Sequence, residues 1–235
     1  MSSMPFVGLL HNDFRDREEG NGQAQTAHHD VARRVRRRPD QDEENPLGVG
    51  GLELHEWVFP LREFQDMHGG GGAGGETNAS SAVVQERWAN IGATIMGRNM
   101  FGPIRGEWPD GSWRGWWGEE PPYHHPVFVL THHPREPLEM EGGTVFEFVT
   151  GGIESALARA KDAAQGDDVW LAGGASVVNQ YLAAGLVDEI DLSIAPLVLG
   201  AGERLFDGIE RGSLKLTQIR AVDAPGATHI KYQVG

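Results

Sequence analysis

Two glycine-containing turns are the clearest candidates for ligand chemistry in this sequence of 235 residues. The turn MGRNM at 96–100 follows the short apolar run ATIM, and the turn AGGAS at 172–176 follows the apolar run DVWL. Helix N-termini present free N–H groups to anions, and glycine lets the backbone approach a phosphate group because it has no Cβ. Either turn alone is more often only a tight turn, but two of them on neighbouring strands could together hold both ends of a dinucleotide.

Arg98 adds a positive charge to the first of these turns. Its guanidinium is planar and permanently charged, and it can donate two parallel hydrogen bonds to an anionic group. The chain has a formal net charge of -14, with -2 on residues 1–45 and -12 on the remainder. A body this acidic repels nucleic acids and anionic membranes at long range, so an anionic ligand must be held by local groups such as Arg98.

Other chemical motifs are weak or missing. The sequence contains no GxxxxGK[ST], which argues against a nucleotide hydrolase, and no cysteine. GxGxxG occurs only within the glycine run at 69–75, which does not join an expected strand to a helix, and this argues against a Rossmann fold. The pairs His124-His125 and His132-His133 flank an expected strand. Because adjacent strand residues point to opposite faces, we predict no metal site. Four tryptophans within residues 102–125 could cover a planar ligand, but we expect them to anchor a long loop.

The elements that would position the two turns follow one another from Pro46 onward. We expect strands at 93–96, 127–131, 144–150, 168–172 and 190–200, and helices at 81–92, 153–164 and 176–184. Ser176 should cap the last helix, and Gly185 should end it. GAGER at 200–204 is interpreted as a structural turn. Residues 214–235 alternate on either side of DAPG and predict a β-hairpin.

Strands that alternate with helices predict an α/β domain over residues 46–235. Its sheet should be mixed and mostly parallel, flanked by helices, with the C-terminal β-hairpin at its edge. Hydrophobic residues make up 39% of the chain, enough for a core, yet no run approaches the ~18 apolar residues of a membrane span. The N-terminus lacks a signal peptide pattern, so we expect a cytoplasmic protein.

Residues 1–45 differ from the rest of the chain. They alternate in charge, contain few large apolar residues and include the basic run RRVRRR at 33–38. We interpret them as a disordered polar extension. A nucleic-acid-binding arm is the alternative, but acidic residues at 40 and 42–44 follow the basic run directly and weaken it.

Several segments resemble the dihydrofolate-reductase-like superfamily. They are MGRNMF at 96–101, PVFVLTHHP at 126–134, the long stretch from 168 to 206, and the closing hairpin. Within that superfamily the chain is most similar to the riboflavin-biosynthesis reductase domain (the RibD C-terminal domain), as found in stand-alone bacterial members. The resemblance covers residues 46–235 and implies a reductase that uses NADPH, acts on a small molecule and is commonly a homodimer.

The resemblance also implies which residues bind NADPH. Gly97, Arg98 and Asn99 match a phosphate-binding turn, while Thr131 and His132 fall at the strand end that flanks the adenosine 2′-phosphate. A third group matches the turn at the pyrophosphate and nicotinamide, namely Gly173, Gly174, Ala175, Ser176 and Val177.

The beginning of the chain departs from this family. Family members open with a buried strand and a motif like SLDGFVAGP, which also supplies an acidic group, so we assign no catalytic residue here. PDQDEENPLG at 39–48 nevertheless resembles the family segment that comes directly after that motif. One choice of codons for residues 29–38 encodes MTSLDGFVA in the next reading frame. We therefore hypothesise a frameshift upstream of Pro39, which would leave the sheet without its first strand and which the DNA sequence of the gene tests.

These observations favour a reductase resembling 5-amino-6-(5-phosphoribosylamino)uracil reductase of riboflavin biosynthesis. A dihydrofolate or pterin reductase is an alternative within enzymes. A relative that binds NADPH without catalysis is an alternative of another class, since the family's opening motif is missing. We expect no nucleic-acid or membrane partner.

Overall fold

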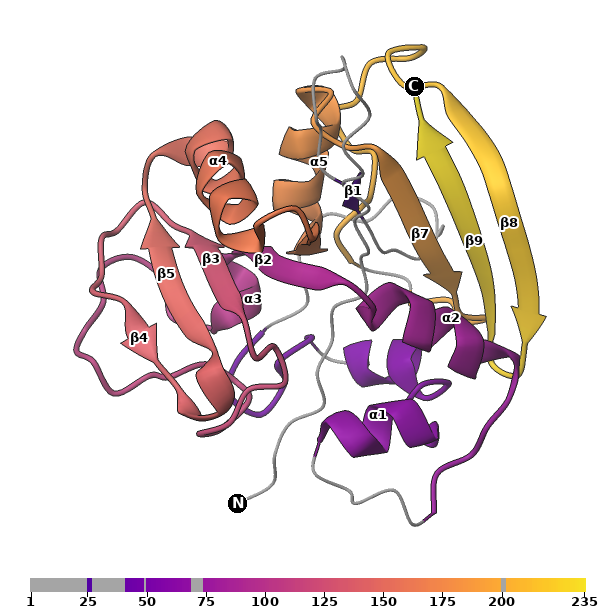
Figure 1. Cartoon of the computed structure of the whole chain (residues 1–235), viewed down its shortest axis with the longest axis horizontal. Coiled ribbons are helices and arrows are strands. Elements are labelled where there is room, and N and C mark those ends of the chain that lie inside the picture. Colours follow the sequence, from indigo (N-terminus) through magenta and orange to yellow (C-terminus); the bar gives the residue numbers. More distant parts are fainter. Residues whose placement is uncertain (1–24, 27–40, 49, 69–73, 200–201) are drawn as a thin grey trace.

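The computed structural model describes residues 25–26, 41–48, 50–68, 74–199 and 202–235. A six-stranded sheet has the order β1-β6-β2-β3-β5-β4, and a three-stranded sheet has the order β7-β9-β8 (Figure 1). The strands are β1 (Gln25–Thr26), β2 (Ile91–Gly97), β3 (Pro126–Leu130), β4 (Leu138–Glu139), β5 (Val145–Val149), β6 (Asp168–Gly173), β7 (Glu189–Ile194), β8 (Leu216–Ala224) and β9 (Ala227–Val234).

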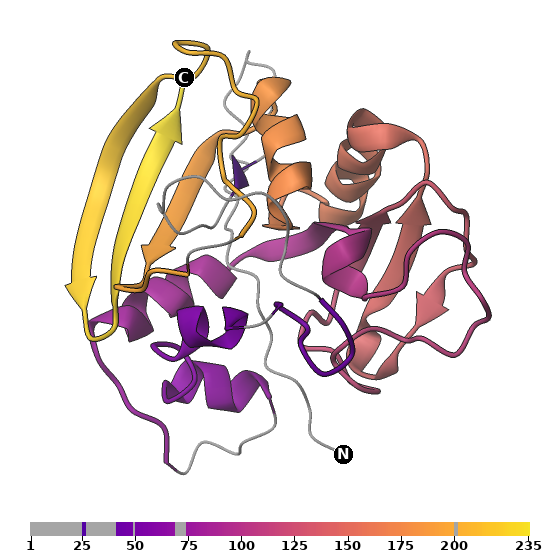
Figure 2. The ribbon, with the colours of Figure 1, turned by 180° about the vertical axis from the view of Figure 1, so that it is seen from behind.

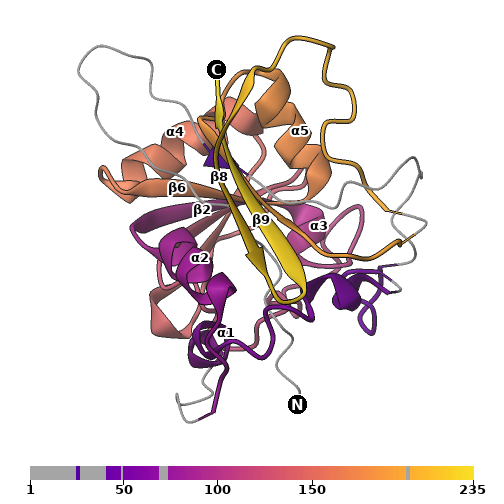
Figure 3. The same ribbon diagram turned by 90° about the vertical axis from the view of Figure 1, so that its right-hand side faces the viewer.

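Helices cover both faces of the larger sheet. The α-helices are α1 (Arg62–Met67), α2 (Ala79–Trp88), α3 (Arg98–Phe101), α4 (Gly152–Ala164) and α5 (Ala175–Ala183), with short 3-10 helices η1 (Gly51–His55) and η2 (Glu141–Gly143). Seen along the sheet, α4 and α5 lie on one side of β2 and β6, and α1 and α2 lie on the other (Figure 3). Among the described residues, no helix is long and apolar enough to cross a membrane.

The larger sheet follows from its sequence pattern. All six residues of β6 are buried, as expected for a central parallel strand covered on both faces. Strands β1, β6, β2, β3 and β5 run parallel, and only β4 is antiparallel to its neighbour. Helix α4 packs a stripe of buried small and apolar residues, Ala156, Leu157, Ala160 and Ala164, toward the core. The predicted mixed, mostly parallel sheet with flanking helices is confirmed.

The C-terminal hairpin is confirmed, but its place is different. Strand β9 lies between β7 and β8 and pairs antiparallel with both, so the hairpin belongs to a second sheet and is not an edge of the first (Figure 2). The predicted long strand from 190 to 200 is wrong as well. β7 ends at Ile194, because Pro196 has no N–H to donate to a ladder and Leu197 N–H turns back to the Ala195 carbonyl at 2.8 Å.

Two helix boundaries also differ from the prediction. Helix α2 ends at Trp88, because Ala89 has extended backbone and Asn90 is left-handed at φ 63, so that Ile91 already belongs to β2. Helix α5 begins at Ala175 with Gly174 as its N-cap, so Ser176 lies inside the first turn and does not cap it. Gly185, with φ 65, ends this helix as predicted.

Helix α2 is joined to the second sheet by a buried chain of polar side chains. Arg87 donates to the Asp191 carboxylate and, at 2.9 Å, to Ser193 Oγ. Ser193 Oγ lies 2.8 Å from His229 Nδ1, and His229 Nε2 lies 2.9 Å from Ser80 Oγ. All five side chains are buried, so each polar group depends on its neighbours rather than on water.

The N-terminal stretch is described at two places. Residues 25–26 form β1, which pairs in parallel with Trp170 and Leu171 of β6, so the sheet has a short strand at the edge where we expected none. Residues 41–48 form a turn closed by the Gly48 N–H and the Asn45 carbonyl at 3.0 Å. The remainder of residues 1–40, including RRVRRR, lies outside the described residues, and the boundary at residue 45 stays a prediction.

Candidate cofactor site

The two glycine turns lie against each other at the carboxyl-terminal end of the parallel strands, which is the edge of the larger sheet meant below. Strands β2 and β6 are adjacent and parallel, with Met96 opposite Gly173. A Cβ built on Gly97 would lie 2.7 Å from Val177 Cγ2, and one built on Gly173 would lie 3.7 Å from the Met100 sulfur. The structure therefore brings together the turn after β2 and the turn after β6, as the sequence predicted.

Strand β3 brings a third segment to the same edge. Leu130 lies opposite Gly97, so Thr131 begins the chain segment beside the first turn. Thr131 is buried, and its Oγ1 accepts a hydrogen bond from the His133 N–H at 3.1 Å. This local turn leaves His132 at its exposed apex. Thr131 and His132 thus lie next to the turn of Arg98.

The two glycines have different physical roles. Gly97 has φ -81 and ψ 153, a conformation that any residue adopts, so its missing Cβ matters because Val177 occupies that space. We expected Gly97 to make room for a phosphate, but the Cβ that this glycine lacks would point toward Val177 of the other turn. Gly173 has φ 119, which favours glycine whatever the surrounding space. The peptide bond from Gly173 to Gly174 is cis.

Helix α5 begins at this edge with its N-terminal turn. Gly174 is the N-cap, and its carbonyl accepts the N–H groups of Val177 at 2.9 Å and Val178 at 3.1 Å. The first N–H groups of a helix lie outside its own hydrogen-bond ladder and, with the helix dipole, favour a negative charge. Ala175 and Ser176 contribute such groups directly after β6.

Arg98 is held by the long loop that follows α3. Its Nη1 donates to the Gly106 carbonyl, and its guanidinium carbon lies 3.7 Å from the centre of the Trp108 ring. Its Nε and Nη2 are buried and find no hydrogen-bond partner among the described residues. A buried donor without a partner costs about 1–3 kcal/mol, so these two N–H groups are available to an acceptor beyond those that the described residues supply.

Arg135 shares this environment. Its guanidinium lies 4.8 Å from the Trp108 ring, its Nη2 donates to the Trp113 carbonyl at 2.7 Å, and its buried Nη1 has no partner within the described part of the chain. Burial lowers the pKa of Arg98, and the like charges of Arg105 and Arg135 lower it further. These arginines, which we call the arginine cluster (Arg98, Arg105 and Arg135), form a positive region on an acidic protein.

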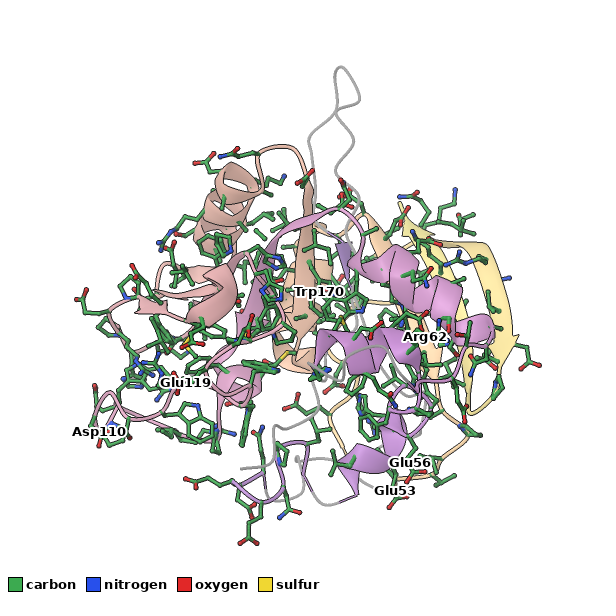
Figure 4. The ribbon with its side chains drawn as sticks, turned by 60° about the horizontal axis from the view of Figure 1, so that its bottom comes forward. Glu53, Glu56, Arg62, Asp110, Glu119 and Trp170 are labelled. Atoms are coloured by element: carbon green, nitrogen blue, oxygen red, sulfur yellow. The ribbon has the colours of Figure 1, made fainter. Side chains whose placement is uncertain are left out.

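The predicted anchoring of the tryptophan loop is confirmed. Trp108 Nε1 donates to the His133 carbonyl at 3.0 Å, and Trp113 Nε1 donates to the Phe101 carbonyl at 3.1 Å. Trp117 stacks on Phe146 with ring centres 5.7 Å apart. The loop extends from the core to the periphery of the molecule at Asp110 (Figure 4). By fixing Trp108, it also fixes the surface on which Arg98 stacks.

The histidine pairs have separate partners. His124 Nδ1 lies 2.9 Å from the Gly142 carbonyl, His125 Nε2 lies 2.7 Å from Thr94 Oγ1, and His133 Nδ1 lies 3.1 Å from the Glu107 carboxylate. Within the described ranges, no group of three or more His, Asp or Glu side chains could hold a metal ion.

Sequence reasoning missed Arg105, Arg135 and Trp108 as parts of this site. Arg135 was visible as a basic residue four positions after Thr131, in a chain with only 20 basic residues. Arg105 and Trp108 lie in an irregular loop, and no periodic pattern places such a loop relative to a strand end. The contact of Trp108 with both Arg98 and Arg135 emerges only from the fold.

Similar solved structures are distant ones. A protein assigned to riboflavin biosynthesis in Shewanella sp. PV-4 is 24% identical, with a TM-score of 0.46 over 63% of this chain and 76% of that one. A pyrimidine reductase-like protein from Corynebacterium diphtheriae is 16% identical, with a TM-score of 0.41 over 66% of this chain and 81% of that one. RibD from Acinetobacter baumannii is 16% identical, with a TM-score of 0.43 over 68% of this chain and 52% of that one.

Two curated relatives from Bacillus subtilis (strain 168) match a shorter segment. Protein YyaP is 46% identical over 68 residues, which are 28% of this chain and 36% of that protein. Protein YwjB is 37% identical over 59 residues, which are 25% of this chain and 33% of that protein. The matched segment thus spans about a third of the length of each relative.

A family model covers most of the fold described above. The RibD C-terminal domain matches residues 63–226, more than two thirds of the chain, and includes both glycine turns, the end of β3 and the second sheet up to its hairpin turn. The match agrees with the resemblance read from the sequence segments and with the observed mixed sheet. The chain therefore belongs to the RibD C-terminal domain family and has its dihydrofolate-reductase-like fold.

Proposed function

We propose that this chain is an NADPH-dependent reductase resembling 5-amino-6-(5-phosphoribosylamino)uracil reductase of riboflavin biosynthesis. One observation carries the proposal. Buried N–H groups of Arg98 and Arg135 find no acceptor among the described residues, and they lie at the edge where β2, β3 and β6 end. An anionic group such as a phosphate would satisfy these donors, and charge-assisted hydrogen bonds to it are roughly twice as strong as neutral ones.

The two sides of the proposed site suit different parts of the cofactor. The side nearer β3 carries the arginine cluster together with Thr131 and His132, and this side suits the 2′-phosphate of NADPH. The side nearer β6 carries the N-terminal turn of α5 and suits the pyrophosphate and the nicotinamide. Its residues are Gly173, Gly174, Ala175, Ser176 and Val177. Between the two sides, Gly97 and Asn99 form the turn that carries Arg98.

The bound cofactor would supply a hydride from its nicotinamide ring. The contribution of the chain itself is then to bind, orient and electrostatically stabilise the cofactor and the small-molecule substrate. We assign no general acid to this chain.

Two measurements on the purified protein test the proposal. NADPH binding is measured by calorimetry, and turnover is followed by the loss of NADPH absorbance with 5-amino-6-(5-phosphoribosylamino)uracil or dihydrofolate as the substrate. We expect binding and turnover of the pyrimidine. Turnover of dihydrofolate alone would favour a pterin reductase, and binding without turnover of either substrate would favour a non-catalytic relative. A chain that does not bind NADPH would refute the whole proposal.

The proposed oligomeric state and partners are also testable. We propose a cytoplasmic enzyme that acts as a homodimer and has no nucleic-acid or membrane partner. Light scattering coupled to gel filtration should then give about twice the chain mass of 25.6 kDa. Removal of residues 33–38 should leave DNA affinity unchanged, whereas a salt-sensitive affinity lost with these residues would identify a nucleic-acid-binding arm.

A further inference from the structure

Gln41 connects three segments beside the candidate site. Its Nε2 donates to the Asn99 carbonyl of α3 at 2.9 Å and to the Pro46 carbonyl of its own turn at 2.6 Å. Its Oε1 accepts a hydrogen bond from Arg105 Nη2 at 2.6 Å. One carboxamide therefore ties the turn at 41–48 to the helix that carries Arg98 and to the loop that carries Arg105.

The contact with α3 gives a hydrogen-bond donor to a carbonyl at the end of this helix. Helix α3 has only four residues, and the Gly102 N–H closes it on the Arg98 carbonyl at 3.0 Å. In a regular helix, the Asn99 carbonyl would accept the N–H of residue 103, but that residue is proline and has none. The Gln41 carboxamide donates to this carbonyl instead and so fixes the end of the turn that presents Arg98.

The contact with Arg105 orients a cation through a neutral acceptor. Arg105 also donates to the Gly102 carbonyl at 3.0 Å, and its charge is close enough to lower the pKa of Arg98. The carboxylate of Asp42, next to Gln41, accepts N–H groups of Glu44 at 2.9 Å and Asn45 at 2.7 Å within its own turn. Because the Gln41 carboxamide carries no charge, its contact with Arg105 leaves the positive charge available to an anion.

We infer that Gln41 is a positioning residue that holds Arg98 and Arg105 for the 2′-phosphate and thereby sets the preference for NADPH over NADH. The inference rests on the proposed function, in which the arginine cluster binds that phosphate. Gln41 is proposed to act through the two arginines and not by direct contact with the nicotinamide or the substrate. Its loss should therefore weaken NADPH binding and leave NADH binding nearly unchanged.

Three substitutions separate the two functions of the carboxamide. Gln41→Met keeps the length of the side chain and removes the hydrogen bonds to Asn99, Pro46 and Arg105. Gln41→Lys keeps a donor for the two carbonyls but releases Arg105. Gln41→Glu keeps the acceptor for Arg105, adds a negative charge beside it and removes the donors. Gln85→Met is the matched control, because Gln85 makes one exposed hydrogen bond to Glu63, at 2.8 Å, between α2 and α1.

The experiment measures the dissociation constants of NADPH and NADH by calorimetry for each variant, with the melting temperature as a check on folding. We expect Gln41→Met to raise the ratio of the NADH to the NADPH affinity about fivefold and Gln41→Glu to raise it about tenfold or more. Gln41→Lys keeps a donor and adds a positive charge near the phosphate, so its ratio should stay below that of Gln41→Met, and Gln85→Met should match the wild type.

Two outcomes would overturn the inference. An unchanged affinity ratio in Gln41→Glu would show that Gln41 does not act on the phosphate, and an equal loss of NADPH and NADH binding in Gln41→Met would show a purely structural role. Both outcomes differ from failure of the proposed function, in which the wild-type protein itself would not bind NADPH.

Discussion

The contact between Gly97 and Val177 makes a prediction about stability that depends only on geometry. A Cβ at position 97 would lie 2.7 Å from Val177 Cγ2, whereas carbon atoms pack best about 3.5–4.0 Å apart. The valine cannot turn aside freely, because a β-branched side chain in a helix has one strongly preferred rotamer. The backbone of Gly97 already suits alanine. Gly97→Ala should therefore cost about 1–3 kcal/mol through overpacking alone.

A double-mutant cycle isolates this contact. Val177→Ala should cost about 1 kcal/mol by itself, because Val177 is half-buried and loses only part of its packing. In the double variant the smaller side chain leaves room for the new methyl group, so we expect a favourable coupling of about 1–2 kcal/mol. Urea denaturation of the four proteins measures the coupling. Additive costs would refute the close approach of the two turns, because residues without contact do not couple.

Two further predictions concern the polar core. Asp191→Asn removes the carboxylate from the fully buried ion pair with Arg87 and should lower the free energy of unfolding by about 3–5 kcal/mol. Glu119→Gln, in the exposed pair with Arg114 at 3.6 Å, should lower it by less than about 1 kcal/mol. Urea denaturation measures both, and equal losses would contradict the prediction. Burial lowers the pKa values of His125 and His229 to about 4, so the unfolded chain takes up these protons first as the pH falls below 6.5. Between pH 7 and 5 each histidine should remove about 2 kcal/mol from the free energy of unfolding. Burial raises the pKa of Asp188 to about 6, which acts in the opposite direction, and a chain that is more stable at pH 5 than at pH 7 would contradict the prediction for the histidines.

The sequence allowed the fold to be predicted where hydrophobic periodicity was strong. The apolar runs that became β2, β3, β5 and β6, the stripe on α4 and the DAPG hairpin turn all follow simple rules of burial and turn chemistry. The order of these elements then placed both glycine turns at one edge of the sheet. The predicted ends of elements were wrong where a single residue sets them, as with Asn90 after α2 and Pro196 after β7.

The candidate site was less predictable than the fold. The positions of Gly97 and Gly173 could be inferred, because strand ends of parallel strands share an edge. The burial of the Arg98 donors could not, because it depends on Trp108 and Gly106, which an irregular loop brings back to α3. The role of Gln41 was equally hidden, since 58 residues separate it from the carbonyl to which it donates.

The central claim is that the paired turns and the arginine cluster bind NADPH, and a calorimetric titration tests it most directly. The wild-type chain is compared with Arg98→Ala and with Arg159→Ala, a control on α4 whose guanidinium pairs with Glu147. We predict that NADPH binds the wild type and the control equally and binds Arg98→Ala more weakly by about 1–3 kcal/mol. Equal affinities for all three proteins, or no binding to the wild type, would contradict the claim.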